Sequence, residues 1–313
     1  MIYREFSQEY EDQVVSLWNR TLTFDILTKE TFENKALFDD NFDVSLTYLA
    51  INEESVVGFI MATKRKFPYL ERGLEESKAW INVFTVDKEY LKSEVPDVLY
   101  EHIEKKLIEL DTKEIIYGAY SPNYFFYGLD DEHYPELANI LLSKGFEKKE
   151  THYSMGRDLH GYSIPEETEF KFIKLREKGY RIENFTYKYS LELLDFLKNE
   201  FGGGWKRNAL IAMQKRKAEE RIILVLDRDN RICGFSMRTI DDNPMRFGPI
   251  GIAQAKRNEG IGSILLHYSM YEMAKKGIYH MFFMTTDEDG KRYYLRNGLS
   301  VIRTVSNYKK AIS

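Results

Sequence analysis

The chain has 313 residues, which is enough for about two domains of ordinary size. Hydrophobic residues make up 43% of it and aromatic residues 14%, so it can bury real cores and is not a disordered protein. Its formal net charge of −5 disfavours nucleic acid as a partner, because a phosphate backbone is bound by a basic surface.

The first half of the chain alternates between strand patterns and helix patterns. Runs of β-branched and aromatic residues predict strands, and apolar residues at helical spacing predict helices. Strands are predicted at residues 2–6, 46–51, 56–63, 79–86, 114–120 and from 146 onward, and helices at 9–21, 29–38, 96–110 and 135–144. This order is typical of an α/β domain with a mixed sheet.

The same order of elements then repeats. A charge-rich stretch with Gly161 and Pro165 predicts a linker over residues 160–178. Beyond it, strands are predicted at 180–185, 222–227, 232–240, 247–253, 278–284 and 299–305, with helices at 191–201, 261–275 and 287–297. We therefore expect an α/β protein, of the α+β mixed-sheet kind, built from two tandem copies of one fold. Their expected ranges are 1–159 and 179–313.

A glycine turn in the second half carries the first functional signal. Residues 257–262 read Arg-Asn-Glu-Gly-Ile-Gly and join a predicted strand to a predicted helix. The first turn of a helix leaves backbone N–H groups without partners and carries a partial positive charge. Glycines at 260 and 262 let a ligand approach that backbone closely. The segment therefore predicts an anion site, most naturally for phosphate.

Two common phosphate motifs do not fit this segment. A dinucleotide fingerprint needs a third glycine and a later acidic residue for the ribose, but Leu265 stands where that glycine belongs. A nucleotide P-loop needs Gly-Lys-Ser/Thr at the turn, which is absent.

The segment farther along supplies the second signal. Residues 287–298 read Asp-Glu-Asp-Gly-Lys-Arg-Tyr-Tyr-Leu-Arg-Asn-Gly. Together the two segments resemble the GNAT acyltransferases, whose loop reads Arg/Gln-x-x-Gly-x-Gly/Ala and whose later segment reads Asn-x-x-Ala-x-x-Phe-Tyr-x-x-x-Gly-Phe. Tyr294 matches the tyrosine, Gly298 the glycine and Asp287 the asparagine. Asp287 and Gly290 depart from the family's Asn and Ala, which weakens the start of that helix.

The resemblance implies an acyl-CoA donor, most simply acetyl-CoA. Its pantetheine would lie along the strand before the glycine turn, and its pyrophosphate would rest on the amides of the turn. The residues assigned to the cofactor are Ile250, Gly251, Ile252, Arg257, Asn258, Glu259, Gly260, Ile261, Gly262 and Ser263. Tyr294 would protonate the leaving thiolate, since a tyrosine with a pKa of about 10 suits that role. A core aromatic is the alternative interpretation of Tyr294.

The general base is not evident from the sequence. Several GNAT enzymes place a glutamate where this chain has Phe282. Asp287, Asp241 and Asp242 are the candidate carboxylates, and a water relay is an equal alternative. Trp205 follows three glycines. We expect its indole either to stack on the substrate or to pack in the core.

The first copy differs from the second where chemistry would occur. Leu91, Glu94 and Pro96 stand at the positions of Arg257, Gly260 and Gly262, and Leu141 stands at that of Tyr294. A carboxylate at the turn repels phosphate, and proline has no N–H to donate. The chain thus resembles a tandem GNAT protein with a degenerate first copy.

The sequence is compatible with two functions. The first is an acetyl-CoA-dependent N-acetyltransferase whose second domain transfers an acyl group to a small-molecule or peptide amine. The second is a non-catalytic module that binds acyl-CoA or a partner. We expect the aromatic run 124–127 to pack between the domains.

Further expectations concern thiols, metals and location. The single cysteine, Cys233, lies in an apolar run and is expected to be a packed thiol. The histidine spacing is not that of a metal site, so no metal is expected. Without a run of eighteen uncharged apolar residues or a long apolar start, we expect no membrane partner and a cytoplasmic location.

Overall fold

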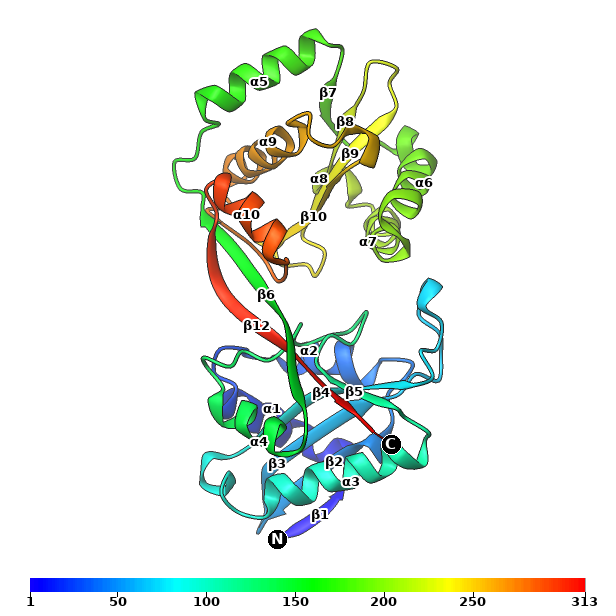
Figure 1. Cartoon of the computed structure of the whole chain (residues 1–313), viewed down its shortest axis with the longest axis vertical. Coiled ribbons are helices and arrows are strands. Elements are labelled where there is room, and N and C mark those ends of the chain that lie inside the picture. Colours follow the sequence, from blue (N-terminus) through cyan, green and yellow to red (C-terminus); the bar gives the residue numbers. More distant parts are fainter. Residues whose placement is uncertain (313) are drawn as a thin grey trace. The chain divides into compact units, whose positions relative to one another are not determined.

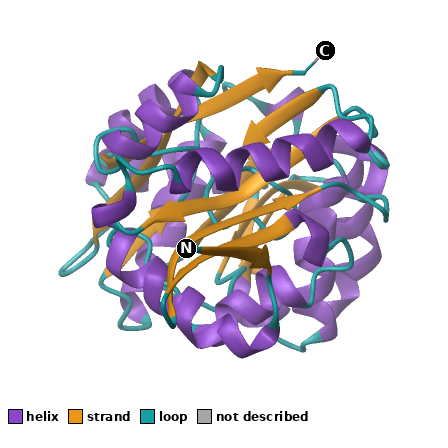
Figure 2. Cartoon of the chain, turned by 90° about the horizontal axis from the view of Figure 1, so that it is seen from below, coloured by secondary structure: helices purple, strands orange, loops and turns teal. Residues whose placement is uncertain are grey.

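The computed structural model describes residues 1–312, which divide into two compact units (Figure 1). The first contains Met1–Tyr153 together with the C-terminal residues from Arg303 onward, and the second contains Ser154–Ile302. Each unit combines helices with β-strands, as the colouring in Figure 2 shows. The predicted mixed α/β class is confirmed. The boundaries of the units lie inside two long strands and so differ from the ranges expected from the sequence.

The first unit is built on a mixed sheet in the order β1-β2-β3-β4-β5-β12, followed by β6. Neighbouring strands run antiparallel except β4 and β5, which are parallel. The strands are β1 (Ile2–Glu5), β2 (Thr47–Asn52), β3 (Ser55–Thr63), β4 (Lys78–Val86), β5 (Glu114–Tyr117), β6 (Glu147–Asp158) and β12 (Ser300–Ala311). The helices are α1 (Glu11–Thr21), α2 (Lys29–Phe32), α3 (Val95–Glu109) and α4 (Pro135–Ser143).

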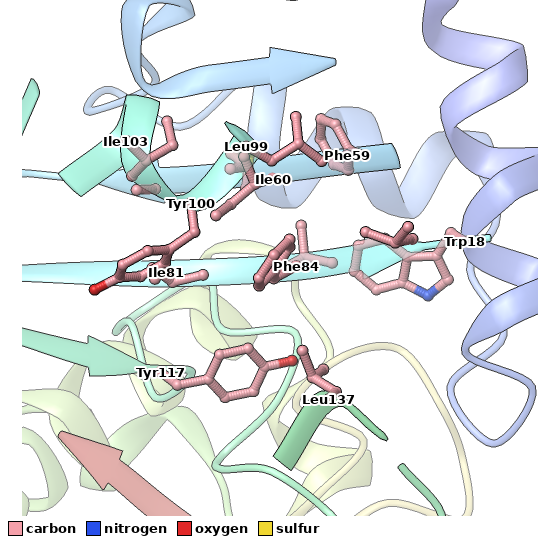
Figure 3. Close-up of a cluster of buried hydrophobic side chains, with 14 of the residues drawn as sticks. Trp18, Phe59, Ile60, Ile81, Phe84, Leu99, Tyr100, Ile103, Tyr117 and Leu137 are labelled. Atoms are coloured by element: carbon pink, nitrogen blue, oxygen red, sulfur yellow. The ribbon is translucent and has the colours of Figure 1, made fainter. Parts of the chain in front are cut away.

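The core of the first unit forms where α1 and α3 pack on β3 and β4. Figure 3 shows Leu99 of α3 beside Phe59 of β3, with Tyr100 and Ile103 of α3 in the same cluster. These side chains recur at helical spacing, so one face of α3 is buried while the other stays polar. Trp18 of α1 is buried in the same cluster. Each such side chain contributes about 1.5–3 kcal/mol by leaving water.

The aromatic run 124–127 does not pack as the sequence led us to expect. Phe125 and Phe126 belong to the core of the first unit. Their ring centroids lie 4.9 and 5.4 Å from that of Trp18. The expectation of packing between domains was wrong for these two residues, because Trp18 of α1 offers them an apolar surface within their own unit.

The second unit contains a separate antiparallel sheet in the order β10-β9-β8-β7. Its strands are β7 (Arg181–Asn184), β8 (Ile222–Leu226), β9 (Ile232–Arg238), β10 (Phe247–Ile252) and β11 (His280–Phe283), the last of which pairs with the Met155–Asp158 part of β6. Its helices are α5 (Glu166–Glu177), α6 (Ser190–Phe201), α7 (Gly203–Gln214), α8 (Ala218–Arg221), α9 (Ile261–Lys275) and α10 (Glu288–Arg296). None of the helices in the described part of the chain combines the length and apolar character of a membrane span.

Helix α5 lies where the sequence predicted a linker. Glutamates occupy its first turn, and Lys174 and Arg176 lie in its last turn, so the charges suit the helix dipole. Leu175 is buried in a cluster with residues of α9, and Phe172 packs against Tyr268 of that helix. Much of the predicted linker is therefore a packed element of the second unit.

The end of the chain supplies a strand to the first unit. Residues Tyr308–Ala311 of β12 pair antiparallel with Glu114–Tyr117 of β5. Arg303, at the start of this portion, donates hydrogen bonds to both carboxylate oxygens of Asp25 at 2.6 Å and a further one to Asp130. Backbone pairing and a partly buried ion network thus hold the C-terminal residues in the sheet.

Ending the chain after Ile302 tests this arrangement. We expect the first unit to lose its cooperative unfolding transition, because β5 loses its ladder to β12 and Asp25 and Asp130 lose their cation. Differential scanning calorimetry, with hydrogen exchange of the β5 amides, measures the effect. A chain that ends at Ile312 is the control. An unchanged transition with protected β5 amides would show that β12 is dispensable.

The same network predicts an acid-sensitive stability. Burial alone would raise the pKa of Asp130, but hydrogen bonds from His133 and Arg303 hold that pKa below its usual value. The folded state therefore favours the carboxylate. This stabilisation is complete above the unfolded-state pKa of about 3.9 and is lost as the pH falls through the lower folded-state value.

Asp130→Asn should lower the free energy of unfolding by about 3 kcal/mol at pH 7. The effect should be smaller below pH 4, where proton uptake by the unfolded wild type begins to remove the same stabilisation. Urea unfolding from pH 3 to 7 measures the difference. Asp12→Asn, at a carboxylate that is 82% exposed, is the control. A destabilisation by Asp130→Asn that stays constant with pH would contradict the assignment.

Candidate active site

The candidate site begins where two strands of the second unit diverge. β10 pairs with β9 on one edge, with a register shift between Phe247 and Ile250. On its other edge the described residues give one bridge to β11, Arg246 with Phe282, and a hydrogen bond from Phe282 N to Met245 O of 3.1 Å. Beyond Arg246, the described residues of β10 and β11 form no ladder with each other. The outer edge of β10 therefore offers backbone groups to an extended ligand.

Different helices cover the two faces of this sheet (Figure 1). The Ser236 and Ser269 hydroxyls are 2.8 Å apart, so Ser236 and its cross-strand partner Ile250 face α9. Gly251 faces α6 and α7, where a Cβ would lie 2.4 Å from Phe201. Glycine is therefore required at residue 251.

The position of Trp205 follows from the same contacts. Its ring stacks on Phe201 with centroids 4.4 Å apart, and a Cβ at Gly251 would lie 2.9 Å from it. The indole is thus packed over β10, on the face opposite α9. This geometry favours the packed-indole interpretation and places an aromatic wall beside the strand.

The glycine turn has the backbone conformation that an anion site needs. Gly260 is the N-cap of α9 in a left-handed conformation with φ of +80°, and Asn258 also has a positive φ of +66°. No side chain caps the helix, its first turn holds no acidic residue, and a Cβ at Gly260 would meet open space. The amides at the start of α9 are thus accessible to a ligand.

Neighbouring contacts hold the turn in place. Glu200 of α6 accepts a hydrogen bond of 2.8 Å from the Gln254 amide, and the Arg257 Nε donates to the Ile252 carbonyl at 3.3 Å. The Tyr180 hydroxyl receives a hydrogen bond from Lys256 and donates one to Glu259. Glu259, the acidic residue of the predicted loop, thus accepts a hydrogen bond close to the positive charge of Lys256.

The corresponding helix start in the first unit is different. The amide of Val95 donates to the Ser93 hydroxyl at 3.2 Å, Pro96 follows directly, and Asp97 adds a negative charge to the first turn of α3. Glu94 is exposed at the N-cap position. These features oppose an anion at this helix start.

Asp287 lies at the N-cap of α10. Its Oδ1 accepts a hydrogen bond of 2.8 Å from the Gly290 amide, and its side chain is exposed. A Cβ at Gly290 would lie 1.9 Å from the Thr286 hydroxyl, which explains why this chain has glycine where the family has alanine.

Two adjacent tyrosines on α10 take different directions. The Tyr294 ring lies 4.4 Å from that of Phe283 on β11. The Tyr293 hydroxyl lies 3.4 Å from the position that a Cβ on Gly262 would take, at the first turn of α9. Burial raises the pKa of both tyrosines, so both hydroxyls stay protonated at neutral pH.

Asn297 joins α10 to α9 and was missed by sequence reasoning. Its Oδ1 accepts a hydrogen bond from Ser263, and its Nδ2 donates to the Tyr293 carbonyl at 2.8 Å. The only local signal was an amide side chain just before Gly298, which is too common to interpret. The contact orients the tyrosine pair relative to the glycine turn.

The remaining candidate carboxylates have structural partners. Asp242 accepts hydrogen bonds from Arg221 at 2.7 Å and from Lys215 at 3.1 Å, which hold its pKa below the usual value. Asp241 lies 3.8 Å from the Nε of Arg246. Arg246 itself is buried, and sequence reasoning also missed it.

Residues 190–299 match the family model described as the acetyltransferase (GNAT) family. A search of curated protein sequences finds no match.

Solved structures resemble nearly the whole chain. One is the GCN5-related glucosamine N-acetyltransferase region of a fungal multi-domain β-N-acetylglucosaminidase, with a TM-score of 0.79 and 15% identity over 98% of this chain. The present chain spans only 38% of that protein. A GCN5-related N-acetyltransferase from Sphaerobacter thermophilus has a TM-score of 0.70 and 13% identity, covering 99% of this chain and 95% of the other.

A third similar structure is described as a tandem GNAT protein from the clavulanic acid biosynthesis pathway. Its TM-score is 0.62 at 11% identity, over 99% of this chain and 98% of that one. At such identities the likeness concerns the fold. Residues 190–299 thus match the acetyltransferase (GNAT) family model, and the whole chain resembles in fold a protein described as a tandem GNAT protein.

Proposed function

We propose that the second unit is an N-acyltransferase that takes its acyl group from acyl-CoA, with acetyl-CoA as the simplest donor. One observation carries the proposal: the uncapped start of α9, with Gly260 in a left-handed conformation, directly follows the strand that diverges from β11. A free strand edge followed by an anion site suits a ligand with an amide-containing arm and a pyrophosphate. The family match over this region supports it.

The proposed contacts follow the chain from β10 into α9. The free backbone edge at residues 250–252 would bind the pantetheine amides as a neighbouring strand would. The amides of residues 258–263 would bind the pyrophosphate, with Arg257 adding a positive charge. The exposed position of Arg257 leaves it accessible to a phosphate.

The proposed chemistry is direct transfer. The acceptor amine attacks the thioester carbonyl carbon, so a C–N bond forms and the C–S bond breaks. Tyr294 donates its hydroxyl proton to the departing sulfur and regains a proton from solvent. Because burial raises its pKa, the hydroxyl remains protonated and ready to donate throughout the neutral range.

The amine must lose a proton before or during attack. A lysine-like amine with a pKa of about 10.4 is deprotonated to about one part in 2,500 at pH 7, a deficit of about 4.6 kcal/mol. We propose a water relay for this step, because Asp242 and Asp241 are engaged with Arg221 and Arg246 respectively. Asp287 stays a second candidate, since the cap hydrogen bond uses its Oδ1 and its side chain is exposed.

A non-catalytic acyl-CoA-binding module is the alternative function. The structural partners of Asp242 and Asp241 favour it, because they leave those carboxylates unsuited to accept the amine proton. Tyr294 favours the enzyme, because a binding module needs no proton donor near the sulfur. A panel of amines, assayed for release of CoA from acetyl-CoA with mass spectrometry of the products, decides between the two. The panel includes glucosamine because of the fungal relative.

Tyr294→Phe should lower kcat by about 10- to 10⁴-fold and change acetyl-CoA affinity by only a few-fold, because only proton delivery is lost. Steady-state kinetics with calorimetric binding measures both quantities. Tyr293→Phe is the matched control, since its hydroxyl lies at α9 rather than beside Phe283. Equal effects of the two variants, or an unchanged kcat in Tyr294→Phe, would remove Tyr294 from the mechanism.

A charge pair at Gly260 tests the anion site. Gly260→Glu and Gly260→Lys pay the same backbone cost, because both place a side chain at a φ of +80° where there is open space. We expect the glutamate to abolish acetyl-CoA binding and the lysine to retain much more of it. Calorimetry on both folded variants measures the difference. Equal affinities would mean that the pyrophosphate binds elsewhere.

A further inference from the structure

A buried arginine beside the proposed site has two nitrogens without hydrogen-bond partners among the described residues. Arg246 is 6% exposed, yet neither its Nε nor its Nη1 has a hydrogen-bond partner. The Asp241 carboxylate lies 3.8 Å from Nε, which is within ion-pair range but too far for a hydrogen bond. Burying donors of a charged group without acceptors is unfavourable, so an acceptor from a ligand would stabilise this guanidinium.

A second buried arginine in the same unit shows what a structural role looks like here. Arg221 is 8% exposed. Its Nη1 donates to the Thr239 carbonyl and its Nη2 to Asp242, both at 2.7 Å. Arg221 thus receives acceptors from the fold for both Nη1 and Nη2, whereas two of the Arg246 nitrogens, Nε and Nη1, have none among the described residues.

The strand register places Arg246 on the face opposite α9. Arg238 lies two residues after Ser236 on β9 and so shares its α9-facing side. Phe247 is the cross-strand partner of Arg238 and faces the same way. Arg246 precedes Phe247 and therefore points to the other face, which α6, α7 and Trp205 cover.

The position of Arg246 along the strand relates it to the proposed CoA contacts. Arg246 bridges to Phe282 at the point where β10 and β11 diverge, and its guanidinium lies 5.9 Å from the Phe282 ring centroid. The proposed CoA contacts begin at Ile250, just beyond the register shift of β10. Arg246 thus lies past the end of the proposed pantetheine edge, close to where the acyl group and the amine would meet.

The charges around Arg246 select its ligand. Asp241 lies 3.8 Å away, but its side chain is 47% exposed, so water screens its charge and the buried guanidinium keeps part of its positive charge uncompensated. One further negative charge can balance that remainder, whereas a phosphate dianion would leave an excess of negative charge in a buried place. A carboxylate is a single negative charge with oxygens that suit a guanidinium.

We propose that Arg246 binds the carboxylate of the acceptor, so that the acceptors are amines that also carry a carboxylate, such as amino acids. This inference rests on the proposed acyl transfer and narrows its substrate class. Arg246 is then a binding residue for the acceptor and takes no part in proton transfer.

The test compares each of a panel of amino acids with its own amide, which keeps the amine and removes the carboxylate. CoA release from acetyl-CoA is measured in the full chain and in Arg246→Gln. The ratio of kcat/KM for the acid over its amide should fall by about 10- to 100-fold in the variant, as expected for a lost charge-assisted hydrogen bond. Arg238→Gln, on the α9 face, is the control and should keep the ratio.

Other outcomes separate this inference from the proposed function. If acetyl-CoA binds and only amines without a carboxylate, or only amino-sugar phosphates, are acylated, the Arg246 proposal is overturned and the acyltransferase stands. If acetyl-CoA does not bind, the acyltransferase fails. Thermal stabilisation by the same amino acids then decides the role of Arg246. Stabilisation that is equal in wild type and Arg246→Gln, or absent in both, would overturn that role.

Discussion

A β-strand can pair through its backbone groups on both edges. Along most of its length, β10 has a strand partner on only one edge. Past the bridge between Arg246 and Phe282, the described residues of β10 and β11 form no ladder. The chain then turns through Gly260 into a helix whose first amides are uncapped. An extended ligand with amides and an anionic end would supply both missing sets of partners. The proposed contacts to the cofactor and to the acceptor both follow from this divergence.

The first unit shows how few residues separate an uncapped helix start from one that opposes an anion. Its β4 also runs beyond the last residue that pairs with the parallel strand β5. At the start of α3, however, the Ser93 hydroxyl takes the Val95 amide, and Asp97 adds a negative charge. The aromatic residues Phe125 and Phe126 pack on Trp18 in its core, and β12 from the chain end lies beside β5. These features give the first unit a packed core and a helix start that opposes an anion.

Features that depend on residues close together in the sequence could be predicted from the sequence. The glycine turn, α9 and the short helix α10 follow from glycine, periodicity and spacing within a few residues, and the resemblance to GNAT acyltransferases rests on the same segments. The pairing of β12 with β5 was not predictable, because backbone ladders join distant residues without a side-chain code. The high charge of residues 166–177 predicted a linker. The order of those charges, acidic first and basic last, nevertheless suits a helix dipole. The burial of Arg246 depends on tertiary packing, so its missing partners appear only in the structure.

The central claim is that the chain has one acyl-CoA site, at the edge of β10 and the start of α9. Calorimetric titration of acetyl-CoA into the full chain, combined with hydrogen exchange, tests it most directly. The account predicts one site per chain, with new protection of the amides at residues 258–263 and none at the start of α3. Two sites per chain, or protection that appears at residues 93–97 instead, would contradict it.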